Sequence, residues 1–277
     1  MMPVASAALE PRFSVSLAAS EAEIREAQAL RYRVFALEQG AHLPSARAGL
    51  DADEIDPLCD HLLVRDCGSG EVVASTRLLS AERAAARGGF YSQGEFELGA
   101  VLELPGRMLE IGRTCVAQGH RDGATIALLW AGLADYVAAH RFDYLIGCAS
   151  IDLAPGFEAV RTLVAEILDR HGAPEGFRVR PRLALPAAPA RFESGRPEQA
   201  SGVLRLPPLL RAYFRLGAQA CGEACWDPDF KVADVFILLE LSRLAQRYGR
   251  HFLERAEERG GQRRDGPRRL AAPRAAR

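Results

Sequence analysis

The chain has 277 residues, of which 48% are hydrophobic and 26% charged, and its formal net charge at pH 7 is −1. This balance is typical of a globular protein and excludes a wholly disordered chain, a collagen-like chain and a small disulfide scaffold. The near-zero net charge gives no reason to expect nucleic acid as a partner.

The first half of the chain predicts one helix and three strands. Ser20 and Glu23 form a capping box, and apolar residues at helical spacing follow it. Gly68-Ser69-Gly70 between two apolar runs is typical of a hairpin. A polar loop at 40–57 separates the helix from the hairpin. The predicted elements are a helix at 21–38 and strands at 61–66, 72–79 and 108–116.

The second half alternates helices and strands, with a loop rich in proline and alanine at 178–200. The predicted elements are helices at 123–140, 157–171, 206–217 and 242–258 and strands at 144–150 and 233–239. This order predicts an α/β (α+β) fold with a mixed, mostly antiparallel sheet flanked by helices. We expect one domain over residues 1–256 and an arginine-rich, disordered tail over 257–277.

Neither a zinc site nor export is predicted. Among the six cysteines the only close pair is Cys221 and Cys225, and no histidine lies near it. The N-terminus lacks the basic start of a signal peptide. No apolar run approaches the roughly 20 residues of a membrane span. We therefore expect a cytoplasmic protein.

Four acidic residues gather in the loop before the hairpin: Asp51, Asp53, Glu54 and Asp56. Such a group is either a solvated surface or an anionic pocket for a cationic small substrate. Carboxylates can also hold a metal ion, but no nearby histidine supports that interpretation.

Glu110 and Arg113 lie three residues apart in an apolar strand. In a regular strand this spacing places them on opposite faces, whereas a bulge near Gly112 would bring both to one side. A structural ion pair is the competing interpretation, because charges in such a strand are rarely unpaired. Arg77, in the preceding strand, has the same two interpretations.

The turn between this strand and the next helix contains His120, Arg121, Gly123 and Ala124. A strand-to-helix turn directs backbone N–H groups toward an anion, with help from the helix N-terminus. The turn is therefore a candidate anion-binding site, although many such turns have no ligand.

These pieces, in this order, resemble the bacterial ornithine N-alpha-acyltransferases of ornithine-lipid synthesis, also labelled hemolysin-like. The resemblance covers about residues 13–252 and is most specific at Ile146-Gly147-Cys148-Ala149-Ser150. The family is a branch of the GNAT acyltransferases and is akin to the acyl-homoserine-lactone synthases. The resemblance therefore implies a GNAT-like acyl-CoA N-acyltransferase fold. Further matching stretches are 31–35, 59–64, 110–116, 128–130 and 206–210.

The resemblance also implies site residues. The polar set of the acyl-homoserine-lactone synthases is matched here by Arg31, Phe35, Asp53, Asp56, Arg77, Glu110 and Arg113. The acidic loop and the Glu110 strand should then face one cleft. At the cofactor turn the chain departs from the GNAT pattern, with His120, Gly123 and Thr125 at the expected positions. An acyl carrier protein that presents its phosphopantetheine arm is thus the implied donor, with no tightly bound cofactor and no metal.

The implied reaction passes a 3-hydroxyacyl group from acyl carrier protein to the α-amine of L-ornithine and yields lyso-ornithine lipid. Glu110 is our candidate base, and backbone N–H groups near 112–115 are candidates for the oxyanion site. Asp53 and Asp56 are expected to hold the δ-ammonium of ornithine, with Arg31 or Arg113 on its carboxylate.

Two other functions stay open: a synthase that uses S-adenosylmethionine as acceptor, and a non-catalytic, hemolysin-like membrane-associated protein. An acidic carrier protein requires a basic docking patch. The candidate arginines form two groups, Arg178, Arg180 and Arg182, and Arg205, Arg211 and Arg215. The arginine-rich tail predicts peripheral contact with anionic lipid of the inner membrane.

Overall fold

The computed structural model of the chain describes residues 11–43, 45, 48–186 and 205–243. Its centre is an eight-stranded sheet in the order β1-β2-β3-β5-β6-β10-β8, with β9 paired to β10 off this path. β5 and β6 run parallel, and the other paired strands of this sheet are antiparallel. The predicted mixed, mostly antiparallel sheet is confirmed. The strands are β1 (Phe13–Leu17), β2 (Asp60–Asp66), β3 (Val72–Ser80), β5 (Met108–Val116), β6 (Tyr144–Asp152), β8 (Gln219–Ala220), β9 (Cys225–Asp227) and β10 (Val232–Glu240).

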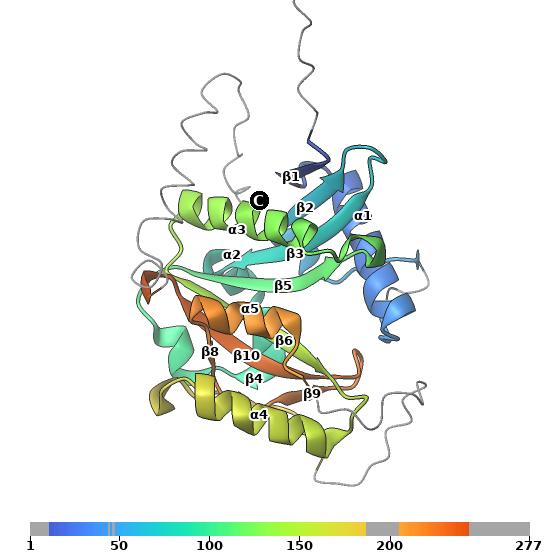
Figure 1. Cartoon of the computed structure of the whole chain (residues 1–277). Coiled ribbons are helices and arrows are strands. Elements are labelled where there is room, and N and C mark those ends of the chain that lie inside the picture. The colour runs from blue at the N-terminus through green and yellow to red at the C-terminus, as the bar shows by residue number, and fades with distance from the viewer. Residues whose placement is uncertain (1–10, 44, 46–47, 187–204, 244–277) are drawn as a thin grey trace, which may run out of the picture.

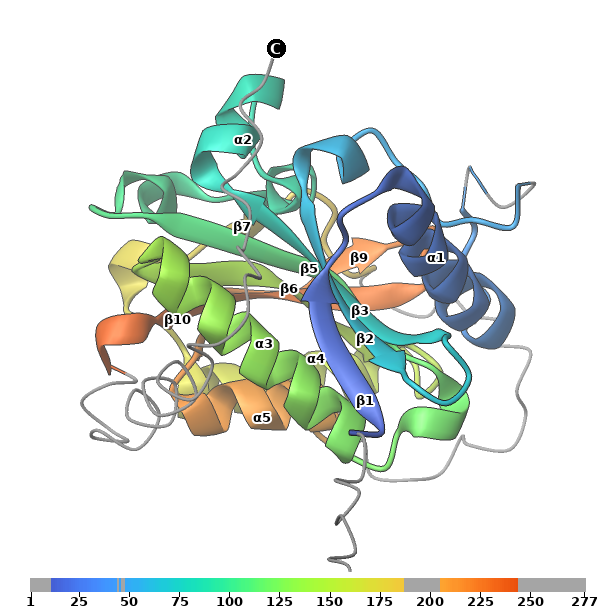
Figure 2. The same ribbon diagram turned by 90° about the horizontal axis from the view of Figure 1, so that it is seen from above.

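Helices lie on both faces of the sheet. In Figure 1 α3, α5 and α4 lie in front of it, and Figure 2 shows α1 and α2 on the opposite side. None of the described helices is long and apolar enough to cross a membrane. The helices are α1 (Glu21–Tyr32), α2 (Ala81–Arg87), α3 (Ala124–His140), α4 (Phe157–His171) and α5 (Pro208–Leu216). Short 3₁₀ turns include η3 (Asp56–Leu58), η4 (Tyr91–Gly94), η5 (Gly99–Glu103), η6 (Gln118–His120) and η7 (Glu175–Phe177).

The sheet is buried on both faces along β10, which explains the nearly continuous apolar run of this strand. Val235 and Phe236 are both fully buried, and their side chains alternate between the two faces. Val235 packs in the cluster that also contains buried residues of α3, α4 and α5. Phe236 packs in a second cluster with Met108 and Ile146 on the other side.

The first helix begins as the sequence predicts. The Glu23 amide donates to Ser20 Oγ at 3.3 Å, and the Glu23 carboxylate accepts from the Ala19 amide at 2.6 Å, not from that of Ser20. α1 continues into a π-helical stretch, Arg33–Glu38, so the helix ends at the predicted residue. Phe35 in this stretch packs edge-on against Phe230, with ring centroids 5.6 Å apart.

Several elements were not predicted. β1, α2 and β9 belong to no predicted helix or strand, and a two-residue strand, β7 (Arg180–Pro181), lies in the predicted loop, where it pairs with β4 (Phe96–Glu97). Of the predicted helix at 242–258 only the first two residues are described. The rest of it, the tail at 257–277 and part of the 178–200 loop lie outside the described residues.

Two irregularities of β5 create the space for a site. β5 pairs with β6 only from Met108 to Glu110, and the two strands diverge beyond that point. Against β3, the register changes between the pairs Ser75–Cys115 and Arg77–Gly112, so β5 carries one extra residue there. Arg113 at this bulge has a φ of 52°. Of the two arrangements that the sequence leaves open for this strand, regular or bulged near Gly112, the structure has the bulged one.

Candidate active site

A cavity of about 250 Å³ opens where β5 and β6 diverge. Leu209 and Tyr213 of α5 line it from the face of the sheet that α3, α4 and α5 cover in Figure 1. Phe35, Tyr91 and Phe230, which belong to none of these three helices, also line it. Residues of both diverging strands also line the cavity, and its polar lining includes Gln39, Arg77, Glu95, Glu110, Gly112, Arg113, Thr114, Ser150, Asp227 and Asp234. A second cavity of about 450 Å³ adjoins it and shares Tyr91, Arg113, Asp227 and Phe230 among its lining residues.

The acidic loop of the sequence forms a network with three arginines. Arg31 bridges Asp51, at 3.0 Å, and Asp56, at 2.7 Å. Arg77 donates to both oxygens of Asp53 at 2.7 Å. The members of this network, from here on the Arg/Asp network, are Arg31, Asp51, Asp53, Asp56, Arg77 and Arg113.

The Arg/Asp network is balanced in charge and mostly buried, since Arg31 is 1% exposed and Asp56 2%. Burial opposes ionisation of Asp56, but the hydrogen bond and charge of Arg31, with Arg77, hold the pKa of Asp56 below its usual range. Neither Arg31 nor Asp56 lines a cavity. The structure thus brings the predicted residues together but divides them: Arg31 and Asp56 lie beneath the cavities, Arg77 lines the first cavity, and Asp53 lines the second.

Arg113 is the member of the network that lines both cavities. Its guanidinium lies 4.9 Å from the Tyr91 ring centroid and 4.4 Å from that of Phe230. Its Nε lies 3.2 Å from an Asp51 carboxylate oxygen. Aromatic rings and a buried carboxylate therefore hold this cation at the cavity wall, an arrangement suited to a carboxylate ligand.

Glu110 also lines the cavity, and its side chain is 4% exposed. Its carboxylate accepts hydrogen bonds from the Tyr91 amide at 2.7 Å, the Ser92 amide at 2.8 Å and Ser92 Oγ at 2.5 Å. Burial raises the pKa of Glu110, although the bonds from Ser92 and Tyr91 favour the charged form. Glu110 thus anchors the η4 turn, and its carboxyl group is positioned by that turn.

Sequence reasoning missed a second acidic group, here called the acidic triad: Glu95, Asp227 and Asp234. One carboxylate oxygen of each lies within 4.8 Å of the others, and all three residues line the cavity. Burial and the neighbouring carboxylates raise the pKa of Glu95, and burial does the same for Asp234. Among the described residues this is the group whose geometry could hold a metal ion. The sequence carries a signal for Asp234, because Asp234 is a charged residue within an apolar strand, as Glu110 is.

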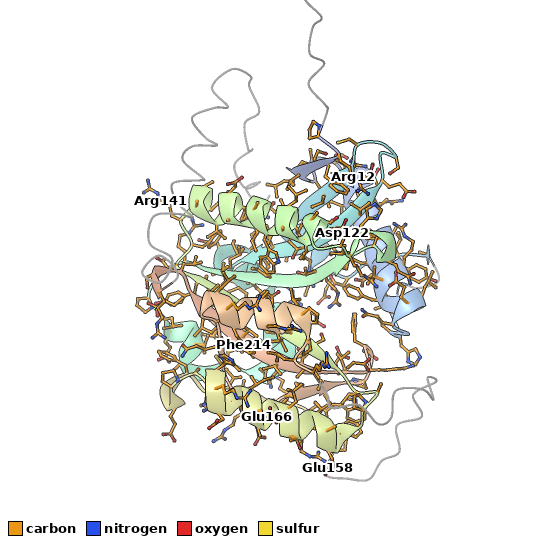
Figure 3. All side chains as sticks on the ribbon, viewed as in Figure 1. Arg12, Asp122, Arg141, Glu158, Glu166 and Phe214 are labelled. Atoms are coloured by element: carbon orange, nitrogen blue, oxygen red, sulfur yellow. The ribbon has the colours of Figure 1, made fainter. Side chains whose placement is uncertain are left out.

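The predicted donor turn lies at the start of α3, outside both cavities. Figure 3 shows Asp122 at this end of α3, and its carboxylate accepts from the Ala124 amide at 3.1 Å. Arg121 pairs with Glu38 at 2.6 Å, and His120 lies 3.5 Å from an Asp66 carboxylate oxygen. Gly123 has a φ of 94° and open space at its Cα. At this turn the His120 and Arg121 side chains and the Ala124 amide therefore have partners within the protein, whereas His120 Nδ1 and Thr125 Oγ1 have none among the described residues.

Comparison with known proteins agrees with this architecture. The family model of the acetyltransferase (GNAT) domain matches residues 30–131. The solved structure of BjaI, a CoA-dependent acyl-homoserine lactone synthase, superposes with a TM-score of 0.51 at 14% identity and covers 92% of this chain and 95% of that one. At this identity the likeness shows the fold, which is the predicted GNAT acyltransferase fold.

Curated relatives are closer in sequence. The L-ornithine N(alpha)-acyltransferase of Rhodobacter capsulatus is 36% identical over 259 residues, which is 90% of this chain and 97% of the relative. The enzyme of the same name from Rhizobium meliloti is 39% identical over 249 residues, 84% of this chain and 81% of the relative. The resemblance predicted from the sequence is confirmed, and the chain belongs to the L-ornithine N(alpha)-acyltransferase family.

Proposed function

We propose that this chain transfers a 3-hydroxyacyl group from acyl carrier protein to the α-amine of L-ornithine and forms lyso-ornithine lipid. The names of its relatives support this activity. The structural observation that carries the proposal is the cavity at the β5–β6 divergence, lined by Arg113, Glu110 and strand backbone. Such a cavity combines a carboxylate-binding cation with an open strand edge beside which an acyl donor can lie.

The donor arm would lie between the diverging strands. Beyond Glu110 and Ile146 the facing edges of β5 and β6 are no longer paired with each other. Unpaired strand groups favour an amide-bearing ligand, and a phosphopantetheine arm carries amides. Leu209 and Tyr213 offer apolar surface for the acyl chain. At the α3 turn His120, Arg121 and the Ala124 amide already have partners within the protein, which supports a donor that does not need a pyrophosphate site and favours acyl carrier protein over coenzyme A.

The acceptor would bind with its carboxylate on Arg113. In the structure Asp53 and Asp56 are paired with arginines. We therefore assign Arg31, Asp53, Asp56 and Arg77 to the positioning of Arg113 and the cavity wall, in place of direct contact with the δ-ammonium. Phe35 contributes to the wall through its contact with Phe230.

The chemical step requires that the α-ammonium lose a proton before its nitrogen attacks the thioester carbon. Glu110 remains our candidate for the base, directly or through one water, because it lines the cavity and its pKa is raised by burial. Backbone N–H groups of the bulge at 112–115 would stabilise the oxyanion. The C–N bond then forms, the C–S bond breaks, and the pantetheine thiolate leaves and takes up a proton.

Carrier-protein docking would use the surface near α5, because α5 lines the cavity. Arg205, Arg211 and Arg215 are exposed there. Of the other predicted group, Arg178 and Arg182 donate to the backbone oxygens of Ala173 and Gln93. With an acyl carrier protein as donor, we place the reaction in the cytoplasm, with the arginine-rich tail in contact with inner-membrane lipid.

The proposal is tested by incubating the protein with 3-hydroxyacyl carrier protein and either L-ornithine or S-adenosylmethionine. Mass spectrometry of the products should show acylated ornithine in the first mixture and no acyl-homoserine lactone in the second. A product only with S-adenosylmethionine would overturn the choice of acceptor. No product with either acceptor would favour the non-catalytic alternative.

A further inference from the structure

We propose that the acidic triad of Glu95, Asp227 and Asp234 is the subsite that binds the distal ammonium group of the dibasic amino-acid acceptor. This inference rests on the proposed function and names the residues that select a diamine over an amino acid with a neutral side chain. The three residues come from separate segments, which follow η4, end β9 and lie within β10. They meet only in the folded chain, at the wall of the cavity that also contains Arg113.

The oxygens of the acidic triad are incompletely satisfied. Asp234 is 4% exposed, and its Oδ1 accepts from Ser150 Oγ at 2.7 Å, while its other oxygen has no hydrogen bond from a described residue. Glu95 Oε2 is buried and has no hydrogen-bond partner among the described residues. The Cys148 and Tyr91 side chains lie close enough to the Glu95 carboxyl group to favour its charged form, which lowers its pKa against the larger effect of burial. Asp227 Oδ1 accepts from two backbone amides of its own turn. A nearly fully buried carboxylate with an unused oxygen at the cavity wall points to a missing donor.

The charge of the acidic triad is compensated only in part by the surrounding protein, since the charge of Arg113 favours the ionised form of Asp234 from a distance. No salt bridge joins any of its members to a described arginine or lysine, and Arg113 pairs with Asp51 and Asp53 instead. Burial of unpaired carboxylates is costly and raises their pKa, as it does for Glu95 and Asp234. A cationic group bound at the acidic triad would remove this cost.

An ammonium group fits the cavity better than a metal ion. Arg113 and the acidic triad line the same space, so one cavity offers a cation for a carboxylate and anions for a distant ammonium. An extended ornithine separates its two nitrogens by about 6 Å, from five bonds of about 1.5 Å in zigzag. Oδ1 of Asp227 and Oδ1 of Asp234 already accept hydrogen bonds, which leaves few oxygens for the six or more ligands of a hard divalent cation.

The test compares L-ornithine with L-norvaline, which has the same carbon chain but no δ-amine. We expect Glu95→Gln and Asp234→Asn each to lower the ratio of kcat/KM for ornithine to that for norvaline about 10- to 100-fold, the size typical of a lost charge-assisted hydrogen bond. Both substitutions keep the side-chain volume. The control is Glu223→Gln, which removes an exposed carboxylate from the segment between β8 and β9, and its ratio should equal that of the unsubstituted protein.

Calorimetric titration with L-ornithine, without acyl donor, gives a second readout. Each triad variant should bind ornithine about 10- to 100-fold more weakly. An unchanged ratio and an unchanged Kd in both variants would overturn the subsite while acylation of ornithine by the unsubstituted protein continued. Absence of that acylation would instead refute the proposed function. Activity that is lost with EDTA and restored by Mg²⁺ or Ca²⁺ only when the triad is intact would identify a metal site and overturn the ammonium assignment.

Discussion

Two acidic regions lie beside the same cavity and differ in how their charge is compensated. In the Arg/Asp network each aspartate has an arginine partner; Arg31 and Asp56 lie beneath the cavity, and Asp51 and Asp53 line the adjoining one. In the acidic triad no carboxylate has a cationic partner among the described side chains, and all three line the cavity. The paired acids of the loop therefore support the cavity wall, whereas the unpaired acids of the triad are available to a ligand.

Glu110→Gln should give the largest effect and tests which carboxylate at the cavity takes the proton. If Glu110 is the base, kcat should fall about 10²- to 10⁴-fold, and the acidic limb of the kcat pH profile should disappear. Steady-state kinetics between pH 5 and 9 measure both. An unchanged turnover with an unchanged pH profile would leave Glu110 as an anchor of the η4 turn only.

Arg31→Met tests whether the Arg/Asp network stabilises the fold. It removes the cation shared by Asp51 and Asp56 and leaves two buried carboxylates short of a partner, at a cost of about 3–5 kcal/mol in the free energy of unfolding. Arg87→Met, at an exposed pair with Glu54, should cost less than about 1 kcal/mol. Denaturant unfolding distinguishes the two, and equal losses would contradict a structural role for the buried network.

Arg113→Lys tests whether Arg113 contacts the acceptor or only supports the fold. Lysine keeps the charge but loses the planar fork and its packing between Tyr91 and Phe230. KM for L-ornithine should rise about tenfold or more, with a smaller change in kcat. If KM stays constant and only stability falls, Arg113 belongs with the structural members of the network and does not contact the acceptor.

The smallest effect concerns the acidic triad without ligand. Because the pKa values of Glu95 and Asp234 are raised in the folded state, the folded protein holds more protons than the unfolded chain above about pH 4.5. Stability should therefore fall as pH rises toward the raised values. Glu95→Gln should remove part of this loss and stabilise the ligand-free protein by about 1 kcal/mol at pH 8. Thermal unfolding at pH 5 and pH 8 checks the sign, and a destabilised variant at pH 8 would contradict it.

The sequence predicts the central architecture because its strands and helices carry strong apolar periodicity. Local reasoning leaves the β5 bulge open, since Glu110 and Arg113 share a face only if the strand is irregular. β1 was missed although Phe13–Leu17 alternates in burial, and β9 is only three residues long.

The site is predictable in part. The resemblance to the family identified the members of the Arg/Asp network apart from Asp51, which came from the acidic loop. Their pairing depends on tertiary contacts that spacing does not reveal, and so the aspartates were expected to meet the substrate. Glu95 follows a 3₁₀ turn that no pattern marks, and it meets Asp227 and Asp234 only through the long connections of the fold.

A crystal structure of the protein with L-ornithine tests the central claim most directly. We predict that the carboxylate of ornithine lies on Arg113 and that its Nδ lies about 3 Å from oxygens of Glu95 and Asp234. An ornithine whose Nδ contacts Asp53 and Asp56, or one bound away from the β5–β6 divergence, would contradict it.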